Sequence, residues 1–175
     1  VPSLAEMTRV ALELLVDDPD GFFLMVEGSR IDHAGHANDA AAHVREVLAY
    51  DEAVAVALDF ARRDGQTLVV SVADHETGGL SLGRNVDGRG VYDWHPDVLA
   101  RVQVSYERLI PALRRSERPD ALLQAWLGLD SLRADERALV AQATAEPDTW
   151  PEVLTELIGR RAGVGGPSNG HTAGP

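Results

Sequence analysis

The chain has 175 residues, of which 45% are hydrophobic and 25% charged, so it is long enough for one globular domain with a buried core. It contains no apolar run of about 18 residues, so we predict no membrane-spanning helix. The net charge is −12, and an acidic surface argues against a nucleic-acid partner, whose phosphates it would repel.

The first predicted helix begins at a capping box, with Ser3 as N-cap and Glu6 at the third helical position. Apolar residues at helical spacing extend this helix to about Val16. The apolar run Gly21–Val26 lies between turn signals, which predicts a strand covered on both faces. The polar segment Glu27–Asn38 after it is expected to be a loop.

A long helix is predicted over Ala40–Arg63, ended by Asp64 and Gly65. Its apolar stripe consists of Val44, Val47, Leu48, Val54 and Leu58. The short β-branched segment Thr67–Ala73 then predicts a second buried strand. Strand, helix and strand in this order indicate a right-handed βαβ unit with parallel strands. The carboxyl ends of both strands would share one sheet edge, where open α/β sheets bind ligands.

Candidate metal ligands follow both predicted strands. They are Glu27, Asp32 and His36 after the first strand, and Asp74 and His75 after the second. Because the chain has no cysteine, a metal must use histidine and carboxylate groups, which suit Zn2+, Mg2+ or Mn2+. Two metals about 4 Å apart could stabilise the attacking and leaving oxygens of a phosphoryl transfer. Any one of these residues taken alone could equally be a solvated surface group.

The second half of the chain has the pattern of amphipathic helices. We predict them over Pro96–Ile110, Pro119–Leu127, Ala134–Ala143 and Pro151–Arg161, with Pro111, Pro119 and Pro151 as starts or breaks. The chain would then consist of an α/β core segment at residues 1–90, a helical insertion at 91–161, and a flexible loop at 162–175 that carries His171.

Three segments resemble the alkaline phosphatase family. Residues 27–36, EGSRIDHAGH, resemble its VEGxxIDxxxH segment, and residues 73–79, ADHETGG, resemble a segment common in its bacterial members. Residues 170–172, GHT, are similar to its late HT motif. The resemblance implies an α/β fold, as part of an alkaline-phosphatase-like sheet with flanking helices. Residues 91–161 would be an insertion of the kind that forms a crown over the active site.

Position by position, the resemblance implies two zinc sites. Asp32, His36 and His171 would bind the first zinc, so this site is complete within the chain. Asp74 and His75 would bind the second zinc, whose remaining ligand in the family is an upstream Asp.

The resemblance also implies a magnesium site, of which Glu27 is the one ligand within these 175 residues. His33 falls where the family has a Lys or His near the phosphate, although a His held by loop hydrogen bonds is an equal reading. Thr77 stands where some members have a further His near the second zinc. His43 and His95 match no motif position, and we expect them to be structural or solvated.

The family's nucleophilic Ser, its phosphate-clamping Arg and its other magnesium ligands belong to an N-terminal half, so we expect them upstream of Val1. The chain starts with Val1 and shows no signal peptide, which predicts a processed product or a piece of a longer protein. The implied function is a fragment of a phosphomonoesterase that acts through two zincs and a phosphoserine. The isolated chain is expected to bind about one zinc weakly and to be nearly inactive without the nucleophile.

By resemblance, the ligands would be phosphate monoesters and inorganic phosphate, the location extracellular or periplasmic, and the parent enzyme a candidate homodimer. Two alternatives stay open. One is another hydrolase or mutase of the same superfamily, although such members lack the VEGxxID motif. The other is a non-catalytic metal-binding or assembly module, with the acidic helical segment as its contact surface.

Overall fold

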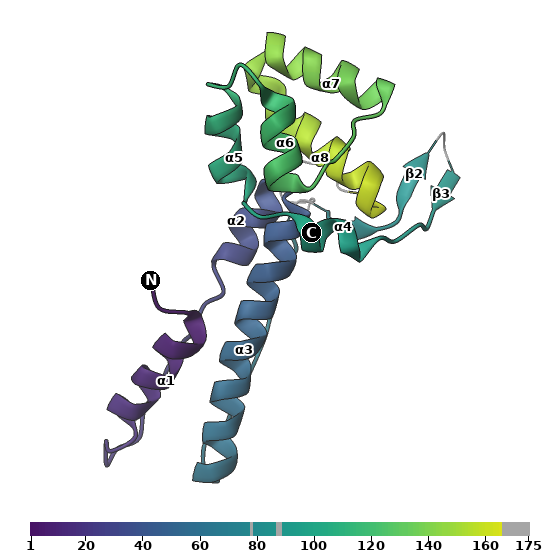
Figure 1. Cartoon of the computed structure of the whole chain (residues 1–175). Coiled ribbons are helices and arrows are strands. Elements are labelled where there is room, and N and C mark those ends of the chain that lie inside the picture. The colour runs from purple at the N-terminus through teal and green to yellow at the C-terminus, as the bar shows by residue number, and fades with distance from the viewer. Residues whose placement is uncertain (78, 87–88, 166–175) are drawn as a thin grey trace.

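A computed structural model describes residues 1–77, 79–86 and 89–165 (Figure 1). Its helices are α1 (Leu4–Leu15), α2 (Arg30–His36), α3 (Ala40–Asp64), α4 (Pro96–Arg101), α5 (Tyr106–Leu113), α6 (Pro119–Leu127), α7 (Ala134–Ala145), the 3-10 helix η1 (Pro147–Thr149) and α8 (Trp150–Ala162). Its strands are β1 (Ser81–Leu82), β2 (Arg84–Val86), β3 (Arg89–Val91) and β4 (Val164–Gly165). The described strands form two antiparallel pairs, β1 with β4 and β2 with β3.

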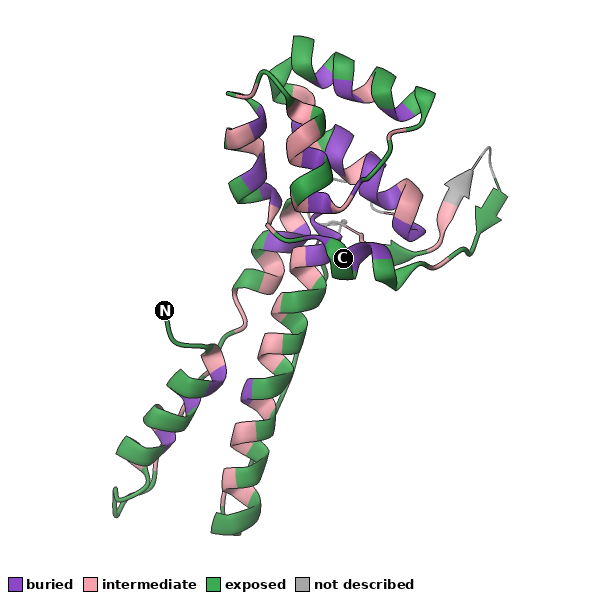
Figure 2. Ribbon diagram, viewed as in Figure 1, coloured by how far each residue is buried: buried purple, intermediate pink, exposed green. Residues whose placement is uncertain are grey.

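The molecule has a long arm and a helical cluster (Figure 1). Helices α1 and α3 pack together as the arm, while α4 to α8 gather at the N-terminal end of α3. Most buried side chains belong to the cluster, as Figure 2 shows. Leu109, Leu123, Leu154 and Leu157 are fully buried there. The segment predicted as an insertion therefore contains the main hydrophobic core of the described residues, and the division into three segments stays a prediction.

Capping residues explain where the arm helices begin and end. Ser3 and Glu6 form the predicted capping box at the start of α1, which confirms that prediction. The Asp39 side chain accepts a hydrogen bond from the N–H of Ala42 at the start of α3. Gly65 ends α3 in the left-handed conformation, with φ at +71°, which glycine adopts without a side-chain clash.

The predicted parallel strands are not paired. Residues 21–26 and 67–73 belong to neither described sheet, so the described residues do not contain the two predicted parallel strands. Alternate side chains of both segments point into solvent, with Phe23 90%, Leu68 85% and Val72 78% exposed. Both segments lie along α3, since Phe22 meets the Phe60 ring edge-on and Ser71 hydrogen-bonds to Tyr50. The described residues simply contain no further strand beside them.

Two further predictions about the first half of the chain need correction. The segment from Glu27 to Asn38 was predicted to be a loop. It contains helix α2, with Ser29 as the N-cap. The predicted apolar stripe of α3 is largely exposed, and its buried positions are Ala40, Ala41 and Ala53 instead. The polar segment between the arm and the cluster thus has more helix, and the arm has less buried surface, than the pattern indicated.

The predicted helix from Pro96 to Ile110 is two helices, α4 and α5. Val102 leaves the helical conformation, and Ser105 is the N-cap of α5. A tertiary contact explains the break, because the N–H of Gln103 donates to the carbonyl of Trp126 instead of continuing a helix. Helix α5 also continues through Pro111, where a break was predicted.

The C-terminal part of the described chain also differs from the prediction. Helix α8 ends at Ala162, and Val164 and Gly165 pair with β1, so residues 162–165 are not the predicted flexible loop. His171 lies outside the described residues. No helix in the described ranges is both long and apolar enough to cross a membrane.

Candidate metal centre

Helix α2 places Asp32 and His36 on one face, one helical turn apart. The Asp32 Oδ2 and His36 Nε2 atoms are 3.5 Å apart, and both side chains are partly exposed. Two ligands at about 2.0 Å from a tetrahedral zinc ion are separated by roughly 3.3 Å. The pair can therefore bind one ion between these two atoms without a change of backbone.

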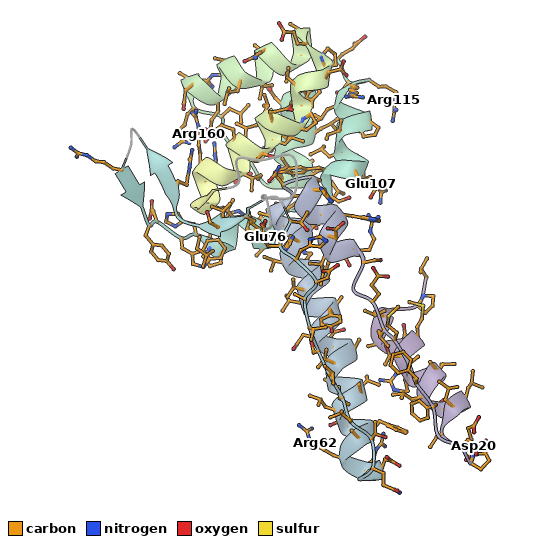
Figure 3. All side chains as sticks on the ribbon, turned by 180° about the vertical axis from the view of Figure 1, so that it is seen from behind. Asp20, Arg62, Glu76, Glu107, Arg115 and Arg160 are labelled. Atoms are coloured by element: carbon orange, nitrogen blue, oxygen red, sulfur yellow. The ribbon has the colours of Figure 1, made fainter. Side chains whose placement is uncertain are left out.

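Asp74 and His75 form a second pair of the same kind. Their Oδ2 and Nε2 atoms are 3.5 Å apart. The His75 Nδ1 atom lies 2.9 Å from the carbonyl oxygen of Glu76, which can only accept, so Nδ1 donates and the neutral ring has its lone pair on Nε2. This is the tautomer that metal coordination through Nε2 requires. Figure 3 shows Glu76 near the junction of the arm and the helical cluster.

A hydrogen bond and, to a lesser extent, nearby carboxylates favour the protonated form of His75. The hydrogen bond to the Glu76 carbonyl raises the pKa of His75, and the nearby carboxylates of Asp74 and Asp32 act in the same direction.

A direct hydrogen bond joins the two motifs. Thr77 Oγ1 donates to Asp32 Oδ1 over 2.7 Å, and Thr77 is buried. The contact requires glycine at position 35, because a Cβ there would lie 2.9 Å from Thr77 Cβ and 3.1 Å from its carbonyl oxygen. The sequence predicted that the two motifs converge at one sheet edge; in the structure they meet by packing of α2 on the second segment.

His33 lies on α2 beside Arg30. The Arg30 Nη1 atom is 3.0 Å from His33 Nδ1, and a guanidinium can only donate, so neutral His33 has its proton on Nε2. Arg30 also forms an ion pair with Glu107 of α5. Figure 3 shows Glu107 close to α2. Glu27 is exposed at the end of the first extended segment.

Asp39 attaches the site to the helical cluster, and sequence reasoning missed this role. Its carboxylate accepts hydrogen bonds from the N–H of Ala42 and of Tyr106, and it is 2% exposed. Burial raises the pKa of Asp39, partly offset by these two bonds. The signal in the sequence was an Asp directly before a helix, which is typical of an N-cap. The contact with Tyr106 has no signal in the sequence.

Within residues 1–77, 79–86 and 89–165, no three histidine or carboxylate side chains are arranged around one ion. The predicted third ligand of the first zinc site, His171, lies outside these ranges. The two described pairs nevertheless fit zinc in donor chemistry, in the separation of their ligand atoms and in the tautomer of His75. They are two candidate ligand pairs, each of one aspartate and one histidine, drawn from two chain segments.

Comparisons with known proteins identify the family of the chain. The family model for alkaline phosphatase matches residues 1–172. The repressible alkaline phosphatase of Saccharomyces cerevisiae is 37% identical over 98% of this chain, and alkaline phosphatase 3 of Bacillus subtilis is 33% identical over 98%. The crystal structure of a cold-active alkaline phosphatase from a psychrophilic Shewanella matches with a TM-score of 0.86 and 31% identity. The chain belongs to the alkaline phosphatase family.

The match covers nearly all of this chain and a smaller part of each relative. The chain corresponds to 34% of the Saccharomyces protein, 37% of the Bacillus protein and 42% of the Shewanella chain, of which it is a C-terminal portion. The structural match covers 98% of this chain and confirms the predicted fold class, part of an alkaline-phosphatase-like α/β fold with flanking helices.

Proposed function

We propose that this chain contributes the zinc ligands of a phosphomonoesterase that hydrolyses phosphate monoesters. The observation that carries the proposal is the hydrogen bond between Thr77 and Asp32, because it joins two ligand motifs from separate segments into one site. The relatives support the substrate class, since they are named alkaline phosphatases. The family generally uses zinc and magnesium.

In this proposal Asp32 and His36 bind the first zinc together with His171, and Asp74 and His75 bind the second. Bound zinc would supply a Lewis acid that activates water and stabilises the leaving oxygen. The Asp32 and His36 atoms already have the separation of two ligands on one ion.

The remaining residues have roles that follow from hydrogen-bonding chemistry. His33, with its proton on Nε2, presents a donor that could bind a phosphate oxygen. Glu27, an exposed carboxylate, would bind Mg2+, which prefers oxygen ligands. The nucleophilic serine of the phosphoserine mechanism would come from sequence N-terminal to these 175 residues. An extracellular or periplasmic location and a homodimer stay predictions from the resemblance.

The test uses the purified 175-residue chain. Zinc is measured by mass spectrometry after dialysis, and turnover is measured with an aryl phosphate. We expect about one zinc per chain and almost no turnover, because the covalent step lacks its nucleophile. His36→Ala should remove the zinc. His95→Ala is the matched control, because His95 pairs with Asp93 and belongs to neither ligand pair, so its loss should leave the zinc content unchanged.

Two outcomes would contradict the proposal. Turnover of the aryl phosphate that a chelator abolishes would show that these residues suffice for catalysis. A chain without any zinc, in the presence of excess metal, would favour a non-catalytic assembly module over a metal site.

A further inference from the structure

We propose that Arg30 is a positioning residue that holds the imidazole of His33 in one orientation, with its Nε2–H directed to donate to a phosphate oxygen. The inference rests on the proposed function, because His33 is the residue placed near the phosphate there. Arg30 is not itself a phosphate ligand in this proposal. It acts through His33, and Glu107 of the helical cluster holds the guanidinium of Arg30 in place.

Arg30 donates to two acceptors through two different nitrogens. Its Nη1 atom lies 3.0 Å from His33 Nδ1, and its Nη2 atom donates to the carboxylate of Glu107. Arg30 and His33 are three residues apart on α2, which places them on the same face of the helix. Because a guanidinium is planar and its donors form a fixed fork, two acceptors at once fix the orientation of its plane. The fixed donor then restricts the rotation of the His33 ring.

The contact with Arg30 decides which group His33 presents to a ligand. Nδ1 accepts from Arg30, so the neutral ring has its proton on Nε2. The two nitrogens of an imidazole point to roughly opposite sides of the ring, so Nε2–H is directed away from Arg30. The oxygens of a phosphate dianion only accept hydrogen bonds, and Nε2–H is the donor that suits them.

A buried contact places Glu107 beside α2. The preceding residue, Tyr106, donates its N–H to Asp39 Oδ2 over 2.7 Å, and the N–H of Asp39 donates to the carbonyl of Ala34 in α2 over 3.0 Å. Glu107 also belongs to the first turn of α5, where the helix dipole stabilises a carboxylate. The start of α5 is therefore fixed against α2, and Glu107 lies close to α2 (Figure 3).

Two other roles of Arg30 predict different results. If Arg30 only links α2 to α5, its removal lowers the unfolding free energy and leaves the orientation of His33 unchanged. If Arg30 is a phosphate ligand, its guanidinium leaves Glu107 when phosphate binds. A positioning role instead changes the orientation of His33 when Arg30 is removed, and it keeps the contact between Arg30 and Glu107 when phosphate is present.

The experiment follows side chains of the 175-residue chain by nuclear magnetic resonance at pH 8, where an ordinary histidine is neutral. Three-bond couplings report the rotation of His33 about its first side-chain bond, and long-range proton–nitrogen correlations report its tautomer. We expect one rotamer, with the proton on Nε2. Arg30→Met keeps a long side chain without donors and should spread His33 over the two rotamers that a helix allows for this bond. Glu107→Ala should produce a smaller spread, because Arg30 is then present but no longer held.

Arg62→Met is the matched control and should leave His33 unchanged, since Arg62 pairs with Asp59 near the C-terminal end of α3, far from α2 in Figure 3. Inorganic phosphate is then titrated into the zinc-loaded chain. The Nε2 resonance of His33 should shift, and Arg30→Met should need about two- to tenfold more phosphate for half of the shift, because phosphate binding then has to order the ring. Circular dichroism checks that each variant is folded.

Three results would overturn the inference while the proposed function stands. They are unchanged rotamer populations of His33 in Arg30→Met, an equal spread in Arg62→Met, or a phosphate titration that separates Arg30 from Glu107. A different result contradicts the proposed function instead. If phosphate leaves the Nε2 resonance unmoved while Arg30→Met spreads the rotamers, Arg30 orients His33 and the proposed role of His33 near the phosphate is wrong.

Discussion

Glycine 35 shows how a single residue connects the two motifs. In a helix, alanine is normally more stable than glycine by about 1 kcal/mol. At position 35 the order reverses, because the added Cβ would lie 2.9 Å from Thr77 Cβ and 3.1 Å from the Thr77 carbonyl oxygen. The steric cost is greater than the gain in helix propensity because one of the two contacts is with backbone, which cannot rotate away.

We expect Gly35→Ala to lower the unfolding free energy by about 1–3 kcal/mol, as overpacking usually does. Urea denaturation measures the change. Gly90→Ala is the matched control, since nothing lies near the Cβ that it would add and its φ is not positive, so it should be close to neutral. Equal stability of the Gly35→Ala chain and the unsubstituted chain would show that the second segment does not pack on α2 as described.

Asp39 is the residue at which the arm and the cluster meet. Asp39→Ala removes the cap of α3 and leaves the buried N–H of Tyr106 without its acceptor. We expect the unfolding free energy to fall by about 2–3 kcal/mol, the sum of a lost cap and an unsatisfied buried donor.

Ser3→Ala is the control for Asp39→Ala, because it removes an exposed cap without affecting the core. It should cost only about 1 kcal/mol in unfolding free energy. Similar losses in the two variants, measured by urea denaturation, would argue against the Tyr106 contact.

At the scale of elements, helices α7 and α8 are joined by a buried charge. Glu136 is fully buried and forms ion pairs with Arg161, which donates through two nitrogens, and with Arg133. These hydrogen bonds, first that of Arg161, lower the pKa of Glu136 to about 2. Removing one member of a buried ion pair leaves the charge of its partner unpaired, which strongly lowers the unfolding free energy.

The sign of the pH dependence follows from this lowered pKa. Ionised Glu136 stabilises the folded state above its ordinary pKa of 4.5, and this stability is lost as the pH falls toward about 2. We expect Glu136→Gln to cost on the order of 3 kcal/mol at pH 7 and progressively less between pH 4.5 and pH 2. Chemical denaturation of both proteins across this pH range measures the difference.

Glu156→Gln is the control for Glu136→Gln, because Glu156 pairs with Arg160 and Arg84 in a partly exposed position. Its effect should stay below about 1 kcal/mol. A constant difference between Glu136→Gln and the unsubstituted chain over the whole pH range would contradict the assigned pKa.

At the scale of the whole molecule, the arm exposes apolar surface. Alternate residues of both extended segments point into solvent, and so does most of the apolar stripe of α3. Extended backbone without a partner, together with exposed apolar side chains, is a surface on which chains associate. Figure 2 shows the contrast with the cluster, where the buried residues concentrate.

We expect the 175-residue chain to bind a hydrophobic dye, and Phe23→Ser to reduce dye fluorescence. Because Phe23 is 90% exposed, this substitution should change the unfolding free energy by less than about 0.5 kcal/mol. Leu12→Ser, at a buried position of α1, is the contrasting control and should cost about 2–5 kcal/mol. A large loss of stability in Phe23→Ser would show that another part of the protein covers this segment.

Much of the local structure was predictable because local physics decides it. The capping box at Ser3 and the glycine stop at Gly65 set the ends of α1 and α3 through hydrogen bonds within a few residues. The types of candidate ligand could also be predicted, since the chain has no cysteine and each motif places an Asp and a His within four residues.

Contacts between distant residues decided the rest. Asp32 and Thr77 meet by packing on Gly35, and Asp39 bonds to Tyr106, none of which has a local signal. The apolar, β-branched character of the two extended segments predicted buried strands, but such a pattern indicates only that a strand can be covered. Whether it is covered depends on a neighbouring strand, and the described residues contain none beside these segments.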